Sequence, residues 1–220
     1  MLDRYRWALW APLSGVAAAA LFVISFVVAG EPGDTSQEIG QFFSDDANRS
    51  QVQVAWVLFS VGILLLIWFV WTLRNRLVAA EGGLTGWATL AFVAGMISIP
   101  LWFVANSVFT APAFDWDGAD FDPDATQLLM AVGYLSFVGA QMVFSVTLIG
   151  TALVAFRTRV FPMWFAWATL IIGLIMLFAI AFFPFFFFLA WLIAAGVLMM
   201  WQSWGAMGGR RTTTTTSAGV

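Results

Sequence analysis

The longest uncharged stretch of this chain includes all residues from Phe161 to Trp204, with no Asp, Glu, Lys or Arg among them. A run of about 18 or more apolar residues is a candidate membrane-spanning helix, because a helix rises about 1.5 Å per residue and the hydrocarbon core is about 30 Å thick. A single helix over this stretch would be about twice as long as the hydrocarbon core is thick. Pro184 cannot donate the hydrogen bond that a continuing helix needs, so the stretch predicts two helices joined there.

Composition places the rest of the chain in a membrane as well. The 220 residues are 62% hydrophobic and only 10% charged, whereas soluble domains are about 25% charged. We expect an all-α fold, a polytopic membrane bundle in one domain over residues 1–206, with a disordered cytoplasmic tail over 207–220. The six transmembrane helices are expected at residues 7–29, 52–73, 84–110, 126–156, 161–181 and 185–202.

Charge placement predicts the orientation of these spans. Eight of the nine arginines fall on one side of a six-span bundle, and ten of the twelve acidic residues fall on the other. The positive-inside rule makes the arginine side cytoplasmic, which predicts a multi-pass protein of a prokaryotic plasma membrane with both termini inside. These arginines are candidate contacts for anionic lipid headgroups. The candidates nearest the spans are Arg4, Arg6, Arg74, Arg76, Arg157 and Arg159.

Processing of the first span has two interpretations. Residues 27–29, Val-Val-Ala, resemble a small-residue cleavage site, as in a signal peptide. The apolar region is longer than the about 7–15 residues of a signal peptide, which favours an uncleaved helix.

Missing residue types exclude several chemistries. The chain has no Cys, no His and no Lys, which excludes disulfides, thiol nucleophiles, zinc sites of the usual kind and a retinal Schiff base. No Asp, Glu, Arg or Lys lies inside the predicted spans, which argues against a proton-coupled pump or a voltage sensor. We therefore assign no catalytic, cofactor-binding or metal-binding residues, expect no cofactor and no nucleic acid partner, and do not expect an enzyme.

The two outer loops carry distinct patterns. Thr35 and Glu38 fit a capping box that begins a short helix, whose Ile39, Phe42 and Phe43 share one face. This helix is expected to lie over the bundle as a structural lid, and a mobile gate is the alternative. The second loop, 115–124, alternates Asp with other residues and is either a solvated acidic loop, with Asp124 capping span four, or a calcium site.

A polar seam is predicted between spans three and four. Ser98, Trp102 and Asn106 share one face of span three with Gly95, and Tyr134, Gln141 and Ser145 share one face of span four. Antiparallel pairing of Gly95 with Ser145, Ser98 with Gln141 and Asn106 with Tyr134 gives index sums close to 240. The seam is either interhelical packing, in which case Gln141→Leu lowers stability, or the lining of a cavity for a small polar or amphipathic ligand.

The N-terminal region resembles a known family. The residues are Gly30-Glu31-Pro32, the segment 35–43, Asn48-Arg49, and the segment 68–77, which ends in Arg74-Asn75-Arg76-Leu77. This pattern is similar to small prokaryotic six-helix membrane proteins grouped as a domain of unknown function. The resemblance is clearest over the first 80 residues. It implies the topology, and it implies no activity and no functional residues.

Two functional hypotheses follow from these patterns. The first is an accessory or lipid/amphiphile-binding membrane protein whose partners are membrane lipids, and other membrane proteins or a second copy of itself. The alternative is a carrier or channel for a small neutral solute, through a cavity between spans three and four. An intramembrane enzyme is the least favoured class, because no nucleophile with a histidine base can be assembled.

Overall fold

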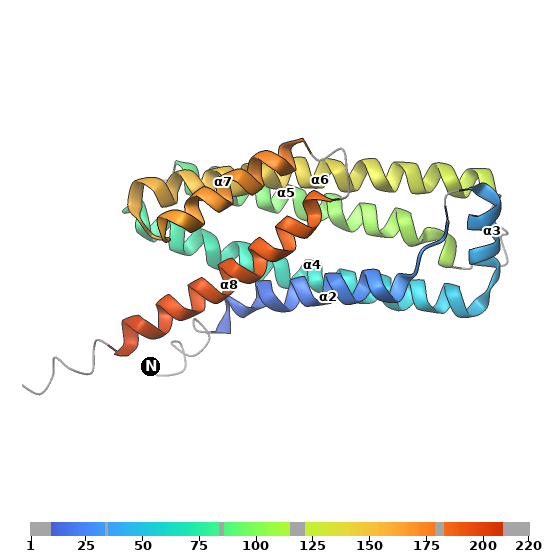
Figure 1. The fold of residues 1–220 in the computed structure, drawn as a ribbon, viewed down its shortest axis with the longest axis horizontal. Coiled ribbons are helices and arrows are strands. Elements are labelled where there is room, and N and C mark those ends of the chain that lie inside the picture. Colours follow the sequence, from blue (N-terminus) through green and yellow to red (C-terminus); the bar gives the residue numbers. More distant parts are fainter. Residues whose placement is uncertain (1–9, 34, 84–85, 115–121, 179–182, 209–220) are drawn as a thin grey trace, which may run out of the picture.

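The computed structural model describes residues 10–33, 35–83, 86–114, 122–178 and 183–208 (Figure 1). Within these ranges every regular element is helical, which confirms the all-α fold class. The elements are α2 (Leu13–Ala29), α3 (Ser36–Ser44), α4 (Asp46–Ala80), α5 (Trp87–Thr110), the 3₁₀ turn η1 (Ala111–Ala113), α6 (Pro123–Thr158), α7 (Met163–Leu177) and α8 (Pro184–Gly208).

Six of these helices correspond to the six expected spans, with different ends. In the described part of the chain, α4, α5, α6 and α8 are long and apolar enough to cross a membrane by length and composition. α2 and α7 are shorter apolar helices of 17 and 15 residues. α4 extends beyond the expected 52–73 at both ends. The added turns, residues 46–51 and 74–80, include charged residues that lie outside the apolar run from which the span was predicted.

Charged residues separate to the two ends of the bundle. α2 begins, α8 ends, and the α4–α5 and α6–α7 connections lie at one end, which we call the arginine end (Figure 1). The described arginines there are Arg74, Arg76, Arg157 and Arg159. The opposite, acidic end carries the starts of α4 and α6, with Asp45, Asp46, Asp122 and Asp124. The alternation predicted from the sequence therefore holds for the described loops, and Arg49 is paired with Asp46 at the acidic end.

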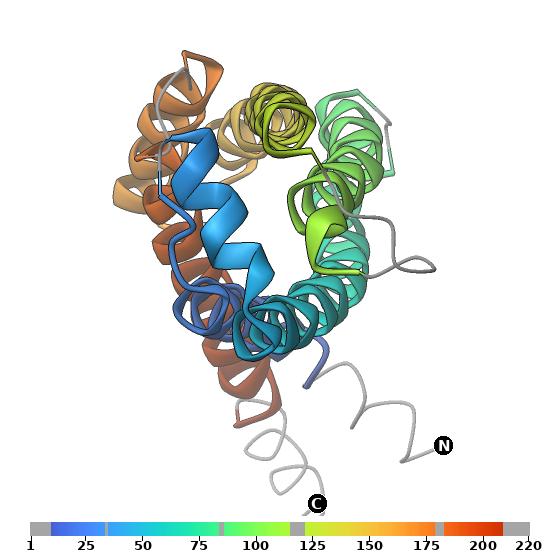
Figure 2. The same cartoon turned by 90° about the vertical axis from the view of Figure 1, so that its right-hand side faces the viewer.

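α3 crosses the acidic end of the bundle, as Figure 2 shows. Its capping box is confirmed: the Glu38 amide donates to Thr35 Oγ1 at 3.3 Å, and the Thr35 amide donates to Glu38 Oε2 at 3.1 Å. Ile39 is buried beneath it, and Ser36 Oγ donates to Gln127 Oε1 of α6 at 2.9 Å. This helix is thus fastened to the bundle as expected of a lid.

The start of α6 differs from the expectation that Asp124 caps this helix. Asp122 is the N-cap residue and Pro123 occupies the first turn. Proline suits that position because its missing N–H would have no helical partner and its φ is already helical. Residues 115–121 of the Asp-rich loop, where the calcium alternative falls, lie outside the described residues.

The α7–α8 hairpin covers only the half of the bundle nearest the arginine end (Figure 1). α7 has 15 residues against 36 in α6, or about 22 Å against about 54 Å. Phe185, in the first turn of α8, lies 5.0 Å from the Phe137 ring of α6 and 6.0 Å from the Phe22 ring of α2. The first turn of α8 therefore sits beside the middle of α6, and Pro184 begins α8 as predicted.

Aromatic rings fill the centre between these helices. Phe188 of α8 lies 5.0 Å from the Trp102 ring of α5 and 4.9 Å from the Phe144 ring of α6, and all three side chains are buried. Trp191 of α8 donates its indole N–H to Thr169 Oγ1 of α7 at 2.9 Å. Such ring pairs contribute about 0.5–1.5 kcal/mol each beyond area burial, so this cluster helps to hold α8 in place.

Gly196 brings α8 into contact with α2. A Cβ added there would lie 2.8 Å from the backbone oxygen of Pro12, which cannot move without moving α2. We expect Gly196→Ala to lower the free energy of unfolding by about 1–3 kcal/mol, the usual cost of overpacking. Thermal unfolding in detergent, followed by circular dichroism, measures this change.

Gly139→Ala is the matched control for that substitution. A Cβ at Gly139, inside α6, would meet nothing within 4 Å. Alanine is the better helix former by up to about 1 kcal/mol, so the control variant should melt at the wild-type temperature or slightly above it. Equal destabilisation by the two substitutions would contradict the close approach of α8 to α2.

Candidate functional site

α5 and α6 pack side by side in the antiparallel register expected for the seam. A Cβ at Gly95 would lie 3.2 Å from Thr147 Oγ1, one at Gly150 would lie 3.0 Å from Ala91 Cβ, and one at Gly133 would lie 3.1 Å from Phe109. The index sums of these pairs are close to 240, as in the predicted register. Thr147 also donates to the backbone oxygen of Ala91 at 2.9 Å. The close backbone approach therefore depends on glycines, as is common between membrane helices.

The hydrogen bonds expected along this seam do not form between the two helices. Ser98 Oγ donates to Gly95 O of its own helix at 2.8 Å, and Ser145 Oγ donates to Met142 O at 2.6 Å. Serine hydroxyls in helices readily bond to the carbonyl three or four residues back, which removes the need for a partner across the interface.

Asn106 faces a different helix from the one expected. Its side-chain amide donates to Trp56 O and Ser60 Oγ of α4, at 3.3 and 3.4 Å, rather than meeting Tyr134 of α6. Tyr134 is partly buried. The helical period correctly places Asn106 on the same face of α5 as Ser98 and Trp102. It does not tell whether a residue at the edge of that face meets α6 or α4.

Gln141 and Trp102 are buried without hydrogen-bond partners among the described residues. Gln141 is 0% exposed and both its amide oxygen and nitrogen lack a partner, as does the indole nitrogen of Trp102. A buried polar group left unpaired costs about 1–3 kcal/mol. The sequence-based expectation that Gln141→Leu lowers stability is therefore reversed, because no seam hydrogen bond is lost.

We expect Gln141→Met to raise the free energy of unfolding by about 1–3 kcal/mol, since methionine fills the same space without polar atoms. Thr147→Val is the contrasting variant, because it deletes the bond to Ala91 O and should lower stability by about 0.6–2 kcal/mol. Thermal unfolding of both variants in one detergent measures the two signs. A lower melting temperature for Gln141→Met would mean that Gln141 stabilises the folded bundle.

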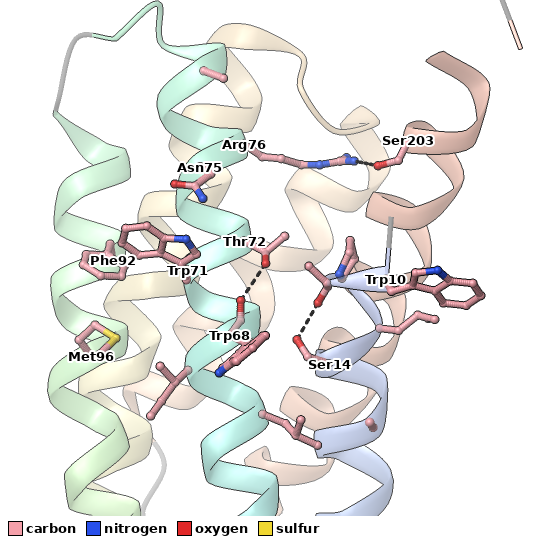
Figure 3. A pocket seen from close by; sticks show the side chains of 17 residues that line it. Trp10, Ser14, Trp68, Trp71, Thr72, Asn75, Arg76, Phe92, Met96 and Ser203 are labelled. Carbon is pink, nitrogen blue, oxygen red and sulfur yellow. Dashed lines mark hydrogen bonds between the residues drawn. The ribbon is translucent and has the colours of Figure 1, made fainter. Parts of the chain in front are cut away.

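A groove lies at the arginine end of the bundle (Figure 3). It has a volume of about 1180 Å³ and lies between the start of α2, α4, α5 and the last turns of α8. On α4 it extends from Leu65 to Ala79, or about 21 Å along the helix axis. Volumes of about 300–1,000 Å³ hold drug-sized ligands, so a larger amphiphile fits this space.

The groove has an apolar part and a polar rim. The apolar side chains include Leu65, Ile67, Trp68, Trp71, Phe92 and Met96. The polar side chains, which Figure 3 places along α4, α2 and α8, are Ser14, Thr72, Asn75, Arg76 and Ser203. Asn75, Arg76 and Ser203 lie toward the ends of their helices, so one end of the groove is polar.

Arg76 closes the polar end of the groove by joining α4 to α8. Its guanidinium donates to Gln202 Oε1 at 2.6 Å, and also to Ser203 Oγ and the backbone oxygen of Met199. Gln202 in turn donates to Val160 O in the α6–α7 connection at 3.1 Å. This network positions the last turns of α8 against the arginine end.

The remaining candidate arginines have different surroundings. Arg74 lies over the rings of Trp71 and Phe92, at 5.4 and 5.1 Å, in a cation–π arrangement. Arg157 and Arg159, at the end of α6, are exposed to solvent, and Arg4 and Arg6 lie outside the described residues. Of the four described arginines in this set, Arg76 alone lines the groove.

Sequence reasoning placed the candidate site on spans three and four and missed the groove. The signals present were Trp68, Trp71 and Trp10, which an aromatic belt explains equally well, and Arg76. Their convergence depends on how α2, α4 and α8 cross, which no local pattern specifies. Among the described residues, no group of three or more acidic side chains is placed to hold a metal ion.

Comparison with known proteins adds one finding. Residues 7–208 match the family described as Domain of unknown function (DUF4386). No curated protein and no solved structure matches the chain. The match covers nearly all of the helical bundle and agrees with the resemblance inferred from the N-terminal residues. The chain therefore belongs to the family Domain of unknown function (DUF4386).

Proposed function

We propose that this protein is a six-span, non-catalytic membrane protein that binds a lipid-like amphiphile in the groove at its arginine end. The observation that carries the proposal is the groove itself, about 1180 Å³ in volume, with an apolar wall and one polar end. This arrangement suits an amphiphile, whose hydrocarbon chain would lie among the apolar side chains and whose headgroup would lie among the polar ones.

The groove also has a suitable length and depth for a lipid chain. It extends about 21 Å along α4 from the arginine end, and one leaflet of the hydrocarbon core is about 15 Å thick. With the arginine end cytoplasmic, the groove opens within the inner leaflet of a prokaryotic plasma membrane. Trp10, Trp68 and Trp71, each more than half exposed, line this groove.

Filling the groove should displace the amphiphile. Ala17 and Ala20 are both exposed on α2, and only Ala17 lines the groove. We expect Ala17→Trp to reduce lipid binding at least tenfold because the indole occupies the chain site. Native mass spectrometry of the delipidated protein, titrated with phosphatidylcholine, measures the dissociation constant of the first bound lipid. Ala20→Trp should bind as the wild type does, and equal loss in both variants would refute the groove as the site.

Orientation is testable because the chain has no cysteine. Gln37 of α3 and Asn75 of α4 are both exposed, at the acidic and arginine ends respectively. On intact cells, a membrane-impermeant maleimide should label Gln37→Cys and leave Asn75→Cys unlabelled until the cells are lysed. The reverse pattern would put the arginine end outside.

The second candidate, a carrier for a small neutral solute between α5 and α6, is favoured by one observation. Gln141 and the Trp102 indole offer donors and an acceptor with no partner inside the described bundle. Against it, Gly95, Gly133 and Gly150 leave little space between the same two helices. The groove therefore supports amphiphile binding better than the seam supports transport.

A further inference from the structure

Arg76 carries a positive charge that no described acidic group neutralises. Its three acceptors, Gln202 Oε1, Ser203 Oγ and Met199 O, are all neutral. The one ion pair among the described residues, Arg49 with Asp46, lies at the acidic end. A partly buried cation without a counter-charge is unfavourable, and an anion bound beside it removes that penalty.

The nearest acidic side chain along the chain is already engaged elsewhere. Glu81, just after α4, accepts a hydrogen bond at Oε2 from the backbone amide of Ala88 at 3.2 Å, at the start of α5. Glu81 does not line the groove. The polar end of the groove is therefore electropositive, and its described polar side chains are hydroxyls, one amide and one guanidinium.

We propose that the amphiphile is an anionic phospholipid of the inner leaflet, whose phosphate binds Arg76 with Asn75 and Ser203 beside it. This proposal rests on the amphiphile-binding function and specifies the ligand class. Three of the guanidinium N–H groups are used within the protein, which leaves donors for a phosphate oxygen. Arginine–phosphate hydrogen bonds are charge-assisted and among the stronger ones in proteins.

The source of the phosphate follows from the shape of the groove. A free phosphate would need only the polar end, whereas the apolar wall continues past Trp68 to Leu65 and Met96. An acyl chain attached to the phosphate would cover that apolar wall, which a free phosphate would leave uncovered. The occupant is therefore a membrane lipid.

Among the described arginines, Arg76 is the one that lines the groove. Arg74 is held on the faces of Trp71 and Phe92, and its Nε is buried without a partner. Arg157, at the same end of the molecule, is exposed and does not line the groove. A general attraction of anionic lipids to the arginine end would involve Arg157 as much as Arg76, so Arg157 is a matched control.

The experiment compares two lipids with identical acyl chains, phosphatidylglycerol and phosphatidylcholine, added to the delipidated full-length protein in detergent. Native mass spectrometry gives the dissociation constant of the first bound lipid for the wild type, Arg76→Gln, Arg76→Lys and Arg157→Gln. Both lipids carry a phosphate, but only phosphatidylglycerol has a net negative charge that compensates Arg76, so we expect the wild type to prefer it by about tenfold. Arg76→Gln should lose that preference, Arg76→Lys should retain part of it, and Arg157→Gln should retain all of it.

The result that overturns the proposal is equal binding of the two lipids by the wild type, or equal loss of preference in Arg76→Gln and Arg157→Gln. Displacement of phosphatidylglycerol by millimolar inorganic phosphate would assign the site to a free anion and also refute it. Retained phosphatidylcholine binding that Ala17→Trp abolishes, without any preference for phosphatidylglycerol, would leave the proposed function standing and this inference refuted.

Arg76→Gln also removes the contacts that hold α8, so its folding is checked by size-exclusion chromatography and thermal unfolding. If that variant does not fold, the salt dependence of lipid binding by the wild type tests the proposal instead. Affinity for phosphatidylglycerol should fall as sodium chloride rises, because screening weakens the ion contact, while affinity for phosphatidylcholine stays constant. No difference in salt dependence between the two lipids would refute the assignment.

Discussion

Hydrocarbon solvates neither charge nor unpaired backbone groups, and this constraint organises the bundle. Backbone hydrogen bonds are satisfied inside each helix, and charged side chains gather at the helix ends. The described arginines other than Arg49 lie at one end, and the described acidic residues other than Glu81 lie at or near the other. The long axis of the molecule is thus also its charge axis, and a ligand site at either end inherits the sign of that end.

Packing inside the bundle comes from shape more than from polar contacts. Phe185, Phe188, Trp102 and Phe144 interlock at the centre, with ring centroids 4.9–6.3 Å apart. Helices are equally apolar toward lipid and toward each other, so close fit decides which faces meet. Gly196 is one such position, where α8 approaches the chain at Pro12. α2 also packs closely against α4, where a Cβ at Gly62 would lie 2.8 Å from the Phe22 ring, and the groove lies alongside this contact at the arginine end.

Two features of this fold are unfavourable for stability. Gln141 and Trp102 have buried polar atoms without partners, and Arg76 is half-buried without a counter-charge. In folded proteins such exceptions are few and they concentrate at sites with a function. Arg76 lies at the end of a groove that a ligand can enter, so a bound anion could compensate its positive charge. Gln141 has no such opening beside it, because the glycines of α5 and α6 bring the two backbones together.

The sequence by itself determined the membrane class, the approximate helices, the capping box at Thr35 and the separation of arginines from acidic residues. Each of these follows from local chemistry: the length of apolar runs, Pro184 as a helix start, and the cost of burying charge. It also predicted the antiparallel register of α5 against α6 closely, from the matching depths of polar and small residues on the two faces.

Only the tertiary structure decided which polar groups meet and where a ligand fits. Ser98 and Ser145 donate to carbonyls of their own helices, and Asn106 donates to α4. Helical periodicity does not predict whether a polar side chain bonds to its own helix or to one of two neighbouring helices. The groove likewise depends on how α2, α4, α5 and the last turns of α8 meet. Crossing angles and depths are set by side-chain fit over the whole interface, which short sequence patterns do not encode.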